Sequence, residues 1–319
     1  MFLKSKLENL QENVSLANHT TFRIGGPAKY FVAAKSIQEL TDAIKWAKEN
    51  YLPVFILGGG SNLLASDEGY NGLIIKFLIF NFQFSILDSK CKIECGAGVA
   101  LGKIIMETSK QGYSGAEWGF GIPGTIGGAV CGNAGRLGQD ISQIVDGVTI
   151  LDKESNIKKL TKEECDFDYR HSRFKGSGEI ILEVSLNFSK KDQAEIEEVL
   201  SEAKKIVKHS PPFPSAGCVF KNYKIKGEQD ELLKNHPELL ERVRGGKLGV
   251  GQLIDATGLK GRQIGGAKIW DGHANYIVNA GGAKARDVLE LISLVKKSVK
   301  AKWGIELEEE VRYLGNFQF

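Results

Sequence analysis

The chain has 319 residues, which is enough for two or three domains with sizeable hydrophobic cores. Hydrophobic residues make up 42% of it and charged residues 25%, as in an ordinary globular protein, and a net charge of +3 is too small to indicate a nucleic-acid-binding surface. Charges interrupt the apolar residues near the N-terminus, so we expect no signal peptide, no membrane anchor and a cytoplasmic location.

The cysteines and histidines are not spaced like a metal site. There are five of each, with no CxxC pair among the cysteines and no HExxH motif among the histidines. We therefore expect no structural disulfide and no bound metal. The cysteines are Cys91, Cys95, Cys131, Cys165 and Cys218.

The first 50 residues predict two helices on either side of a broken strand. Residues 1–18 carry apolar side chains at helical spacing, which predicts a short amphipathic helix. Residues 20–34 predict a strand that two glycines and a proline interrupt. Ser36 and Glu39 form a capping box, so a helix is expected over residues 36–50.

A buried strand is predicted over residues 54–57, and it leads directly into a glycine-rich turn. The turn consists of Gly58, Gly59, Gly60, Ser61 and Asn62. Its N–H groups can converge on a phosphate because no Cβ is in the way. The turn matches neither GxxxxGK[ST] nor GxGxxG, so a plain tight turn is an open alternative.

The most glycine-dense stretch follows a predicted β-meander over residues 72–98 and a helix over 99–111. Residues 112–138 contain ten glycines in 27 positions, with apolar residues interleaved as if buried. Such a stretch needs bare backbone, either for a ligand or for a tightly turned core loop. Its GIPGTIGG segment, residues 121–128, can present N–H groups to phosphate oxygens. With the first turn, it suggests a large ligand with a central diphosphate.

Two arginines lie in a short polar connection between predicted strands. Residues 147–161 predict a hairpin, Thr161 and Glu164 a second capping box, and 179–188 a further strand. Between them, Arg170 and Arg173 are either part of a solvated surface or a clamp for a carboxylate, which paired guanidinium donors match.

The composition changes near Ser189, which predicts a domain boundary there. A helix over 194–208 leads into a proline-rich approach, and Gly217 allows a sharp turn that leaves Cys218 on a stiff support. An inert buried cysteine is the alternative to a reactive thiol at this position.

The rest of the chain predicts four further features. They are charged surface helices within 223–248, a short helix over 250–261, a strand pair over 265–279 and a strong helix over 283–304. A terminal strand over 305–315 places Glu306, Glu308 and Glu310 on one face, for which solvation is the simplest explanation.

The order of these motifs resembles the UDP-N-acetylenolpyruvoylglucosamine reductase (MurB) family. The motifs are TTFRIGGPA, LGGGSNLL, GIPGTIGGAVCGNAG, DYRHSRF, SAGCVFKN, GGAKIWDGHANYIVN and LEEEVRYLG, and together they cover nearly the whole chain. The resemblance implies an α+β fold, with a two-lobed FAD-binding region of the vanillyl-alcohol-oxidase (PCMH) type over 19–189 and a smaller α/β substrate domain over 190–319. The N-terminal helix of 1–18 precedes them, and 223–248 is a possible charged insertion. The short interval between Arg170 and Cys218 implies the short form of the family.

The resemblance also implies the cofactor and the substrate. The protein would reduce UDP-N-acetylglucosamine enolpyruvate to UDP-N-acetylmuramate, a peptidoglycan precursor, with non-covalent FAD and with NADPH as hydride donor. The residues implied to hold FAD are Gly58, Gly59, Gly60, Ser61, Asn62, Gly121, Ile122, Pro123, Gly124, Thr125, Ile126, Gly127, Gly128, Asn133 and Gly135. Those implied to contact substrate are Tyr169, Lys221, Asn222 and Asn275. A monomer is expected.

Three residues match the catalytic positions of the family. Arg170 would stabilise the enolate that forms at the substrate carboxylate, and Glu310 would assist it, with Glu308 as the alternative. Cys218 would protonate the carbon as general acid where most members have serine. A thiol, with an ordinary pKa of about 8.5, is a stronger acid than a hydroxyl.

Three other functions remain open from the sequence. One is an FAD-dependent alcohol or sugar oxidase of the same superfamily. Another is a thiol hydrolase or transferase that uses Cys218 with His209 or His171, although it leaves both glycine loops unexplained. The third is a nucleotide-binding protein without catalytic activity.

Overall fold

The computed structural model describes residues 7–87, 90–227 and 229–317. The chain forms two compact units, and each is built from several chain segments. The first unit runs up to Val14 and then takes Ala28–Gly59 and Asn71–His209. The second unit consists of Ser15–Pro27, Gly60–Tyr70 and Ser210–Phe319. Each unit has its own cluster of buried hydrophobic side chains.

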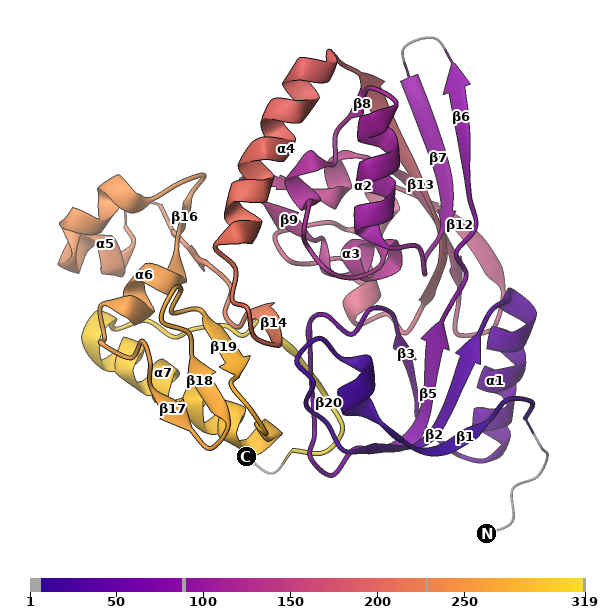
Figure 1. Cartoon of the computed structure of the whole chain (residues 1–319), viewed down its shortest axis with the longest axis horizontal. Coiled ribbons are helices and arrows are strands. Elements are labelled where there is room, and N and C mark those ends of the chain that lie inside the picture. Colours follow the sequence, from indigo (N-terminus) through magenta and orange to yellow (C-terminus); the bar gives the residue numbers. More distant parts are fainter. Residues whose placement is uncertain (1–6, 88–89, 228, 318–319) are drawn as a thin grey trace. The chain divides into compact units, whose positions relative to one another are not determined.

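The first unit begins with a four-stranded sheet in the order β1-β2-β5-β3 (Figure 1). Its strands are Gln11–Ser15, Pro27–Ala34, Tyr70–Phe77 and Val54–Leu57 in that order. Helix α1 (Ile37–Glu49) packs its buried face against the same core, and Ser36 caps it by accepting the Glu39 N–H at 3.1 Å. The predicted strand at 54–57 and the predicted cap are therefore confirmed.

The predicted N-terminal helix is wrong for the residues that the structure describes. Gln11–Ser15 is an edge strand, Leu16–His19 is a 3₁₀ turn, and residues 1–6 of the prediction lie outside the described part. Asn9 and Asn13 have positive φ angles of 57° and 56°, which an α-helix does not allow. The apolar spacing reflects packing at a sheet edge, where Leu7 and Leu10 contact the core.

The second sheet of the first unit has the order β12-β11-β13-β7-β6, with β8 added on β13. Its strands are β6 Phe82–Leu87, β7 Lys90–Gly96, β8 Tyr113–Ser114, β11 Val145–Leu151, β12 Ile157–Thr161 and β13 Ile180–Lys190. A small ribbon joins β9 (Gly135–Arg136) to β10 (Gln139–Asp140). The three strands predicted as one meander are present, but β5 pairs in the first sheet and only β6 and β7 pair with each other here.

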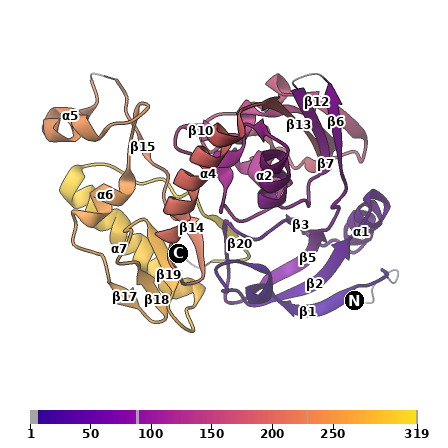
Figure 2. The same cartoon turned by 45° about the horizontal axis from the view of Figure 1, so that its top comes forward.

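Three helices complete this second lobe, and α2 and α4 lie side by side in it (Figures 1 and 2). They are α2 (Leu101–Lys110), α3 (Ile126–Gly132) and α4 (Gln193–Lys208). Short 3₁₀ turns cover Glu117–Gly119, Ile141–Gln143, Glu163–Cys165 and Arg173–Lys175. The predicted capping box forms, because Thr161 N–H donates to Glu164 at 2.8 Å and Glu164 N–H to Thr161 at 3.4 Å.

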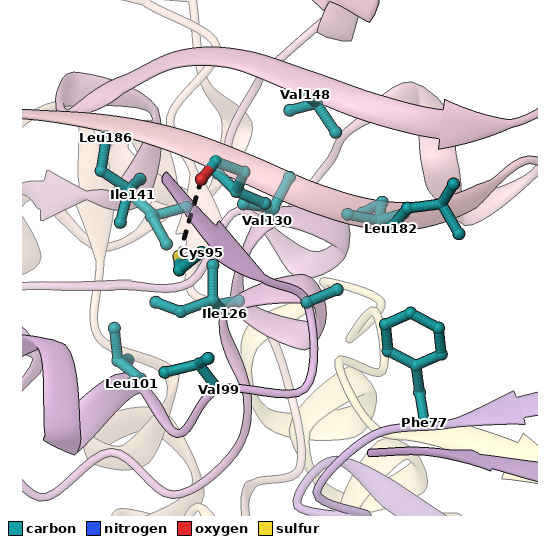
Figure 3. Close-up of a cluster of buried hydrophobic side chains, with 14 of the residues drawn as sticks. Phe77, Cys95, Val99, Leu101, Ile126, Val130, Ile141, Val148, Leu182 and Leu186 are labelled. Atoms are coloured by element: carbon teal, nitrogen blue, oxygen red, sulfur yellow. Dashed lines mark hydrogen bonds between the residues drawn. The ribbon is translucent and has the colours of Figure 1, made fainter. Parts of the chain in front are cut away.

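Cys95 lies inside the core of this lobe, among side chains from α3 and β13 (Figure 3). Its thiol donates to the Val184 carbonyl at 3.6 Å, and only 2% of the residue is exposed. Burial raises the pKa of Cys95 to about 12. All five cysteines are free thiols.

The second unit contains an antiparallel sheet in the order β14-β19-β18-β17. Its strands are Ser215–Cys218, Tyr276–Asn279, Ala267–Ile269 and Gln263–Ile264 in that order. Helix α7 (Ala285–Trp303) packs on β17 and β18, and α6 (Val250–Asp255) packs on α7. The predicted strand pair and strong helix are confirmed.

The charged segment 223–248 is closed by a small ribbon of β15 (Tyr223–Lys224) and β16 (Lys247–Leu248). Between them are α5 (Glu231–Asn235) and a 3₁₀ helix over Pro237–Arg242, as expected of a segment of short surface helices. Leu232 and Leu239 anchor these helices in the core of the second unit.

The predicted terminal strand is shorter than expected. Only β20 (Arg312–Leu314) forms a ladder, and it pairs in parallel with β4 (Leu63–Ala65). Ile305 and Leu307 are nevertheless buried and Glu306 and Glu308 exposed, so the alternation holds, and an isolated antiparallel bridge between Phe220 and Glu309 takes the place of a longer strand. The prediction treated a side-chain pattern as a hydrogen-bonded strand.

Within residues 7–87, 90–227 and 229–317, no helix is long and apolar enough to cross a membrane. The same residues contain no group of three His, Cys, Asp or Glu side chains placed to hold a metal ion.

Candidate functional site

The two glycine-rich turns predicted from the sequence pack directly against each other in the first unit. A Cβ on Gly58 would lie 2.7 Å from Thr125 Oγ1, and a Cβ on Gly59 would lie 2.7 Å from the Gly124 Cα. Real Cβ atoms do not approach other heavy atoms this closely, so both positions require glycine. Two segments 66 residues apart therefore come into close contact. This is the arrangement expected if both turns bind the same ligand.

The second turn is shaped by its own glycines and by one cap. Gly121 has φ +76° and Gly124 has φ +126°, conformations that favour glycine. Thr125 caps α3 by accepting the Gly128 N–H at 3.2 Å. Pro123 and Gly128 are exposed, while Ile126 and Gly127 are buried. The turn thus exposes peptide groups while its apolar side chains anchor it.

Arg170 is tied to the end of this turn. Its guanidinium donates to the Gly135 carbonyl at 2.7 Å and to the Asn133 carbonyl at 3.5 Å. Asn133 itself is 2% exposed, and its side chain donates to the Asp168 carbonyl at 2.9 Å. The Tyr169 ring lies 5.3 Å from the guanidinium carbon. The predicted cofactor loop and the predicted catalytic arginine are therefore neighbours.

Arg173 has a different role from Arg170. It forms a two-point ion pair with Glu179, at 2.9 and 2.6 Å, which lowers the pKa of that carboxyl. It also donates to the Glu164 carbonyl at 2.9 Å. The clamp of two arginines is thus not formed, and Arg170 alone is left as the candidate.

Cys218 ends strand β14 in the second unit and is half-buried. Gly217 has φ +80°, and the pairing of β14 with β19 shifts register between Ser215 and Cys218. This is a β-bulge, which redirects the side chain that follows it. The prediction of a sharp turn at Gly217 is therefore wrong, because this glycine lies within β14, and its positive φ angle forms a bulge that orients Cys218.

Glu310 is fixed close to Cys218 by main-chain hydrogen bonds. The Glu310 N–H donates to the Val219 carbonyl at 2.7 Å. The Asn62 side chain donates to the Glu310 carbonyl at 3.0 Å, and Asn62 accepts the Arg312 N–H at 3.0 Å. The end of the first glycine turn therefore holds the segment that carries Glu310 beside the one that follows Cys218.

The other carboxylates of this segment are engaged elsewhere. Glu308 is exposed and pairs with Lys221, and Glu309 binds Lys296 at 2.9 Å and the Tyr313 hydroxyl at 2.5 Å. Burial and Glu309 together raise the pKa of Tyr313. Glu310 is consequently a better candidate than Glu308 for a role beside Cys218.

The remaining predicted substrate residues lie around the same strand. The Asn222 side chain accepts the Val250 N–H at 3.3 Å. Asn275 is 3% exposed, accepts the Phe220 N–H at 3.0 Å and donates to the Phe220 carbonyl at 2.8 Å. Its amide thus holds the chain that follows Cys218.

The predicted residues form two groups, one in each unit. Arg170, Tyr169 and the glycine turn 121–128 belong to the first unit, while Cys218 and Glu310 belong to the second. The chain passes from one unit to the other between Gly59 and Gly60. Each group is assembled as described, and the joint action of all three catalytic residues stays a prediction.

Two contacts that shape these groups were not predicted from the sequence. A Cβ on Gly60 would lie 2.1 Å from the His19 carbonyl, and the Thr21 N–H of the TTFRIGG motif donates to the Gly60 carbonyl at 3.1 Å, so this motif supports the first turn. Tyr276 is the cross-strand partner of Cys218. The sequence predicted the strand pair of β18 and β19. It did not predict how β19 aligns with β14, because that register depends on the bulge.

The bare backbone at the two turns fits a dinucleotide. Where side chains are excluded at Gly58, Gly59 and Gly124, a diphosphate can approach main-chain N–H groups closely. Residues 28–161 match the FAD-binding domain family. The α+β fold and this match define the class of the protein as a flavoprotein built on an FAD-binding domain.

Residues 188–314 match the C-terminal domain of UDP-N-acetylenolpyruvoylglucosamine reductase. The reductase of Anoxybacillus flavithermus is 39% identical over 317 residues, covering 98% of this chain and 97% of the relative. That of Clostridium tetani is 36% identical over 310 residues, covering 97% and 93%. The crystal structure of the enzyme (MurB) from Thermus caldophilus has a TM-score of 0.75 at 31% identity, covering 94% of this chain and 97% of that one. The chain belongs to the UDP-N-acetylenolpyruvoylglucosamine reductase family.

Proposed function

We propose that the protein reduces UDP-N-acetylglucosamine enolpyruvate to UDP-N-acetylmuramate, with FAD as cofactor and NADPH as reductant. The observation that carries this proposal is family membership over nearly the whole chain, at 39% identity to a reductase. The glycine turns, the arginine and the thiol of the family motifs are all present in this chain. The alternative oxidase and thiol hydrolase have no such support.

The two glycine turns and two residues that follow α3 are the proposed FAD site. We assign to it residues 58–62 and 121–128, with Asn133 and Gly135. The exclusion of Cβ atoms at Gly58 and Gly59 supports the assignment. Held by these residues, the cofactor would supply the hydride-transfer chemistry that connects NADPH to the enolpyruvyl double bond.

Arg170 and Glu310 are proposed to stabilise the charge that develops on the substrate carboxylate. A guanidinium presents paired donors to a planar anion, and bonds to the Gly135 and Asn133 carbonyls hold this one in place. Glu310 would be a second hydrogen-bond partner, positioned through its main chain by Asn62 and Val219.

Cys218 is proposed as the general acid. Its thiol would give its proton to the carbon next to the carboxylate, leaving a thiolate that regains a proton from solvent. The bulge at Gly217 orients this side chain. We also propose that Tyr169, Lys221 and Asn222 contact the substrate, and that Asn275 acts indirectly by holding Phe220.

The domain limits, the monomeric state and the cytoplasmic location stay proposals. The compact units change at 209/210, and the C-terminal family match begins at residue 188. Because the C-terminal family match begins at residue 188, it supports an FAD-binding region that ends before that residue, near the predicted boundary. Helix α4 packs with the first unit, so we propose that it belongs to that region structurally.

The first test is the visible spectrum of the purified protein. We expect a yellow preparation with flavin absorbance, and NADPH oxidation that rises when the enolpyruvyl UDP-sugar is added. A colourless protein that takes up no FAD would refute the proposal. Flavin reduction by an alcohol or sugar, without any effect of the UDP-sugar, would favour the oxidase instead.

The second test separates the two half-reactions in Cys218→Ala. Loss of the proton donor should slow substrate reduction about 100-fold or more, because general acid catalysis contributes factors of this size. Flavin reduction by NADPH should stay close to that of the unaltered protein. Equal slowing of both half-reactions would show that Cys218 is not the proton donor, and Cys131→Ala, another half-buried thiol, serves as the control.

A further inference from the structure

The pairing of β14 with β19 places one particular side chain next to Cys218. The Cα partner of Cys218 is Tyr276, and the Val219 N–H donates to the Asn275 carbonyl at 2.8 Å. This bond lies one residue beyond the pair on each strand, so Cys218 and Tyr276 form a non-hydrogen-bonded pair. In such pairs the Cα atoms are about 4.5 Å apart and the two side chains, on the same face, are at their closest.

The β-bulge decides that this neighbour is Tyr276. Ser215 pairs with Val278, and in the same register Cys218 would lie opposite Asn275. One extra residue in β14, at the positive-φ position of Gly217, moves Cys218 on to Tyr276. A one-residue shift turns a side chain to the other face of a sheet, so the bulge determines what the thiol contacts.

The Tyr276 ring is itself held on two sides. It packs edge-on to His273, with ring centroids 5.4 Å apart, and to Trp270 at 6.1 Å. His273 accepts the Asn275 N–H at 3.2 Å and lies over Gly251, where a Cβ would be 2.6 Å from its ring. An aromatic ring fixed in this way has little freedom to move away from the thiol.

We propose that Tyr276 is a positioning residue for Cys218, whose ring restricts the thiol to the rotamer from which it protonates the substrate. This inference rests on the proposed function of Cys218 as general acid. A cysteine side chain has three staggered χ1 rotamers, and a rigid ring on the same face of the strand limits which of them are available. The ring carries this role, and the Tyr276 hydroxyl does not.

The experiment compares Tyr276→Phe, which keeps the ring, with Tyr276→Leu, which removes it but keeps an apolar side chain of moderate volume. Tyr30→Leu is the matched control. Tyr30 is also a half-buried tyrosine, and its ring packs edge-on to Trp46 at 5.3 Å. Two readouts are needed for each variant: alkylation of Cys218 by iodoacetamide, followed by peptide mass spectrometry without substrate, and the rates of the two half-reactions.

We expect Tyr276→Leu to change the alkylation rate of Cys218 several-fold and to slow substrate reduction about tenfold or more, since misplaced catalytic groups lose rate steeply. Flavin reduction by NADPH should stay unchanged, and Tyr276→Phe should restore the behaviour of the unaltered protein in both readouts. If the rates of Cys218 alkylation and of substrate reduction in Tyr276→Leu both stay within twofold of those of the unaltered protein, the proposal is overturned. Equal changes in Tyr30→Leu, or failure of Tyr276→Phe to restore both readouts, would also overturn it.

The two readouts also separate this inference from the proposed function. If the protein has no reductase activity but alkylation of Cys218 still responds to Tyr276→Leu, the proposed function fails while the contact stands. If the reductase is active and neither readout responds, Tyr276 does not position Cys218 and the proposed function is unaffected.

Discussion

Arg170 has a backbone conformation that is uncommon for a large side chain. Its φ is 53°, in the left-handed region, and Lys175 donates to its carbonyl at 2.6 Å. Together with the bonds to Gly135 and Asn133, this leaves the guanidinium in a fixed place at the end of the glycine turn. Strained residues held by their surroundings are frequent at functional sites.

Arg170→Lys should therefore lower kcat by about 100-fold, because an ammonium group cannot replace two directed donors. The measurement is steady-state reduction of the enolpyruvyl substrate at saturating NADPH, with FAD content checked by absorbance. Arg173→Lys is the control, since Arg173 is paired with Glu179, and it should lower stability while kcat stays near that of the unaltered protein. Similar activity losses in both variants would argue against a specific role for Arg170.

Cys95 gives a prediction about stability at high pH. Its folded-state pKa is raised to about 12, so the folded protein keeps the proton while the unfolded chain loses it near the ordinary thiol value. Its contribution is fully present below about pH 8.5 and is lost as the pH rises towards 12. The free energy of unfolding, measured with urea, should fall less between pH 8 and pH 10.5 in Cys95→Ala than in the unaltered protein.

At pH 8, Cys95→Ala should be less stable by about 1–2 kcal/mol, because a small cavity forms and the bond to Val184 is lost. A Cys95→Ala variant with the pH dependence of the unaltered protein would contradict the assignment to Cys95.

The two glycine turns act as one structural element, although 66 residues separate Gly58 from Gly124. Their contact depends on missing side chains, and the obstacle at Gly59 is the Gly124 backbone, which cannot rotate away as a side chain can. Ile126 and Val130 anchor the second turn in the core through α3. A change at this contact should therefore affect ligand binding more than global folding.

Gly59→Ala should reduce the FAD content of the purified protein at least tenfold, since the added methyl would lie 2.7 Å from the Gly124 Cα and spread the turns apart. Gly132→Ala is the matched control in the same glycine-rich stretch. It lies at the end of α3 with no atom within 4 Å of its added Cβ, and should keep its flavin. The ratio of absorbance at 450 nm to that at 280 nm measures both variants. Full flavin content in Gly59→Ala would show that the turns do not grip the cofactor.

The second unit is built from chain segments that lie far apart in the sequence. Phe22, Ile24 and Leu64 contribute to the core formed mainly by residues 216–311. Strand β4 pairs with β20, and Asp67 caps α7 by accepting the Ala285 and Arg286 N–H groups at 2.8 and 3.2 Å. The second unit is therefore not a simple C-terminal domain.

Asp67→Ala should lower the free energy of unfolding by about 1 kcal/mol, because a carboxylate at a helix N-terminus satisfies two backbone donors and interacts with the helix dipole. Urea denaturation followed by tryptophan fluorescence measures this, as Trp270 and Trp303 both lie in the second unit. Glu68→Ala, at the neighbouring exposed carboxylate, should be neutral. Equal effects of the two variants would rule out the cap.

Many elements were predictable from the sequence because their signals are local. The caps at Ser36 and Thr161, the helices expected over 36–50, 194–208 and 283–304, and the strand at 54–57 all form as predicted. The failures involve pairing with distant segments. Residues 11–15 become a strand by joining β2, and β5 leaves the expected meander for the first sheet. Spacing shows that a side chain is buried, but not which partner buries it.

The residue types already indicate the chemistry of the candidate site: two turns of bare backbone, one arginine, one thiol and a run of carboxylates. The folded structure shows that Arg173 is paired, that the Glu310 N–H bonds to Val219 while the Glu308 side chain pairs with Lys221, and that Tyr276 is the cross-strand partner of Cys218. The reason is that residue type fixes what a group can do, whereas its neighbours depend on strand register. Here a single extra residue at Gly217 sets that register.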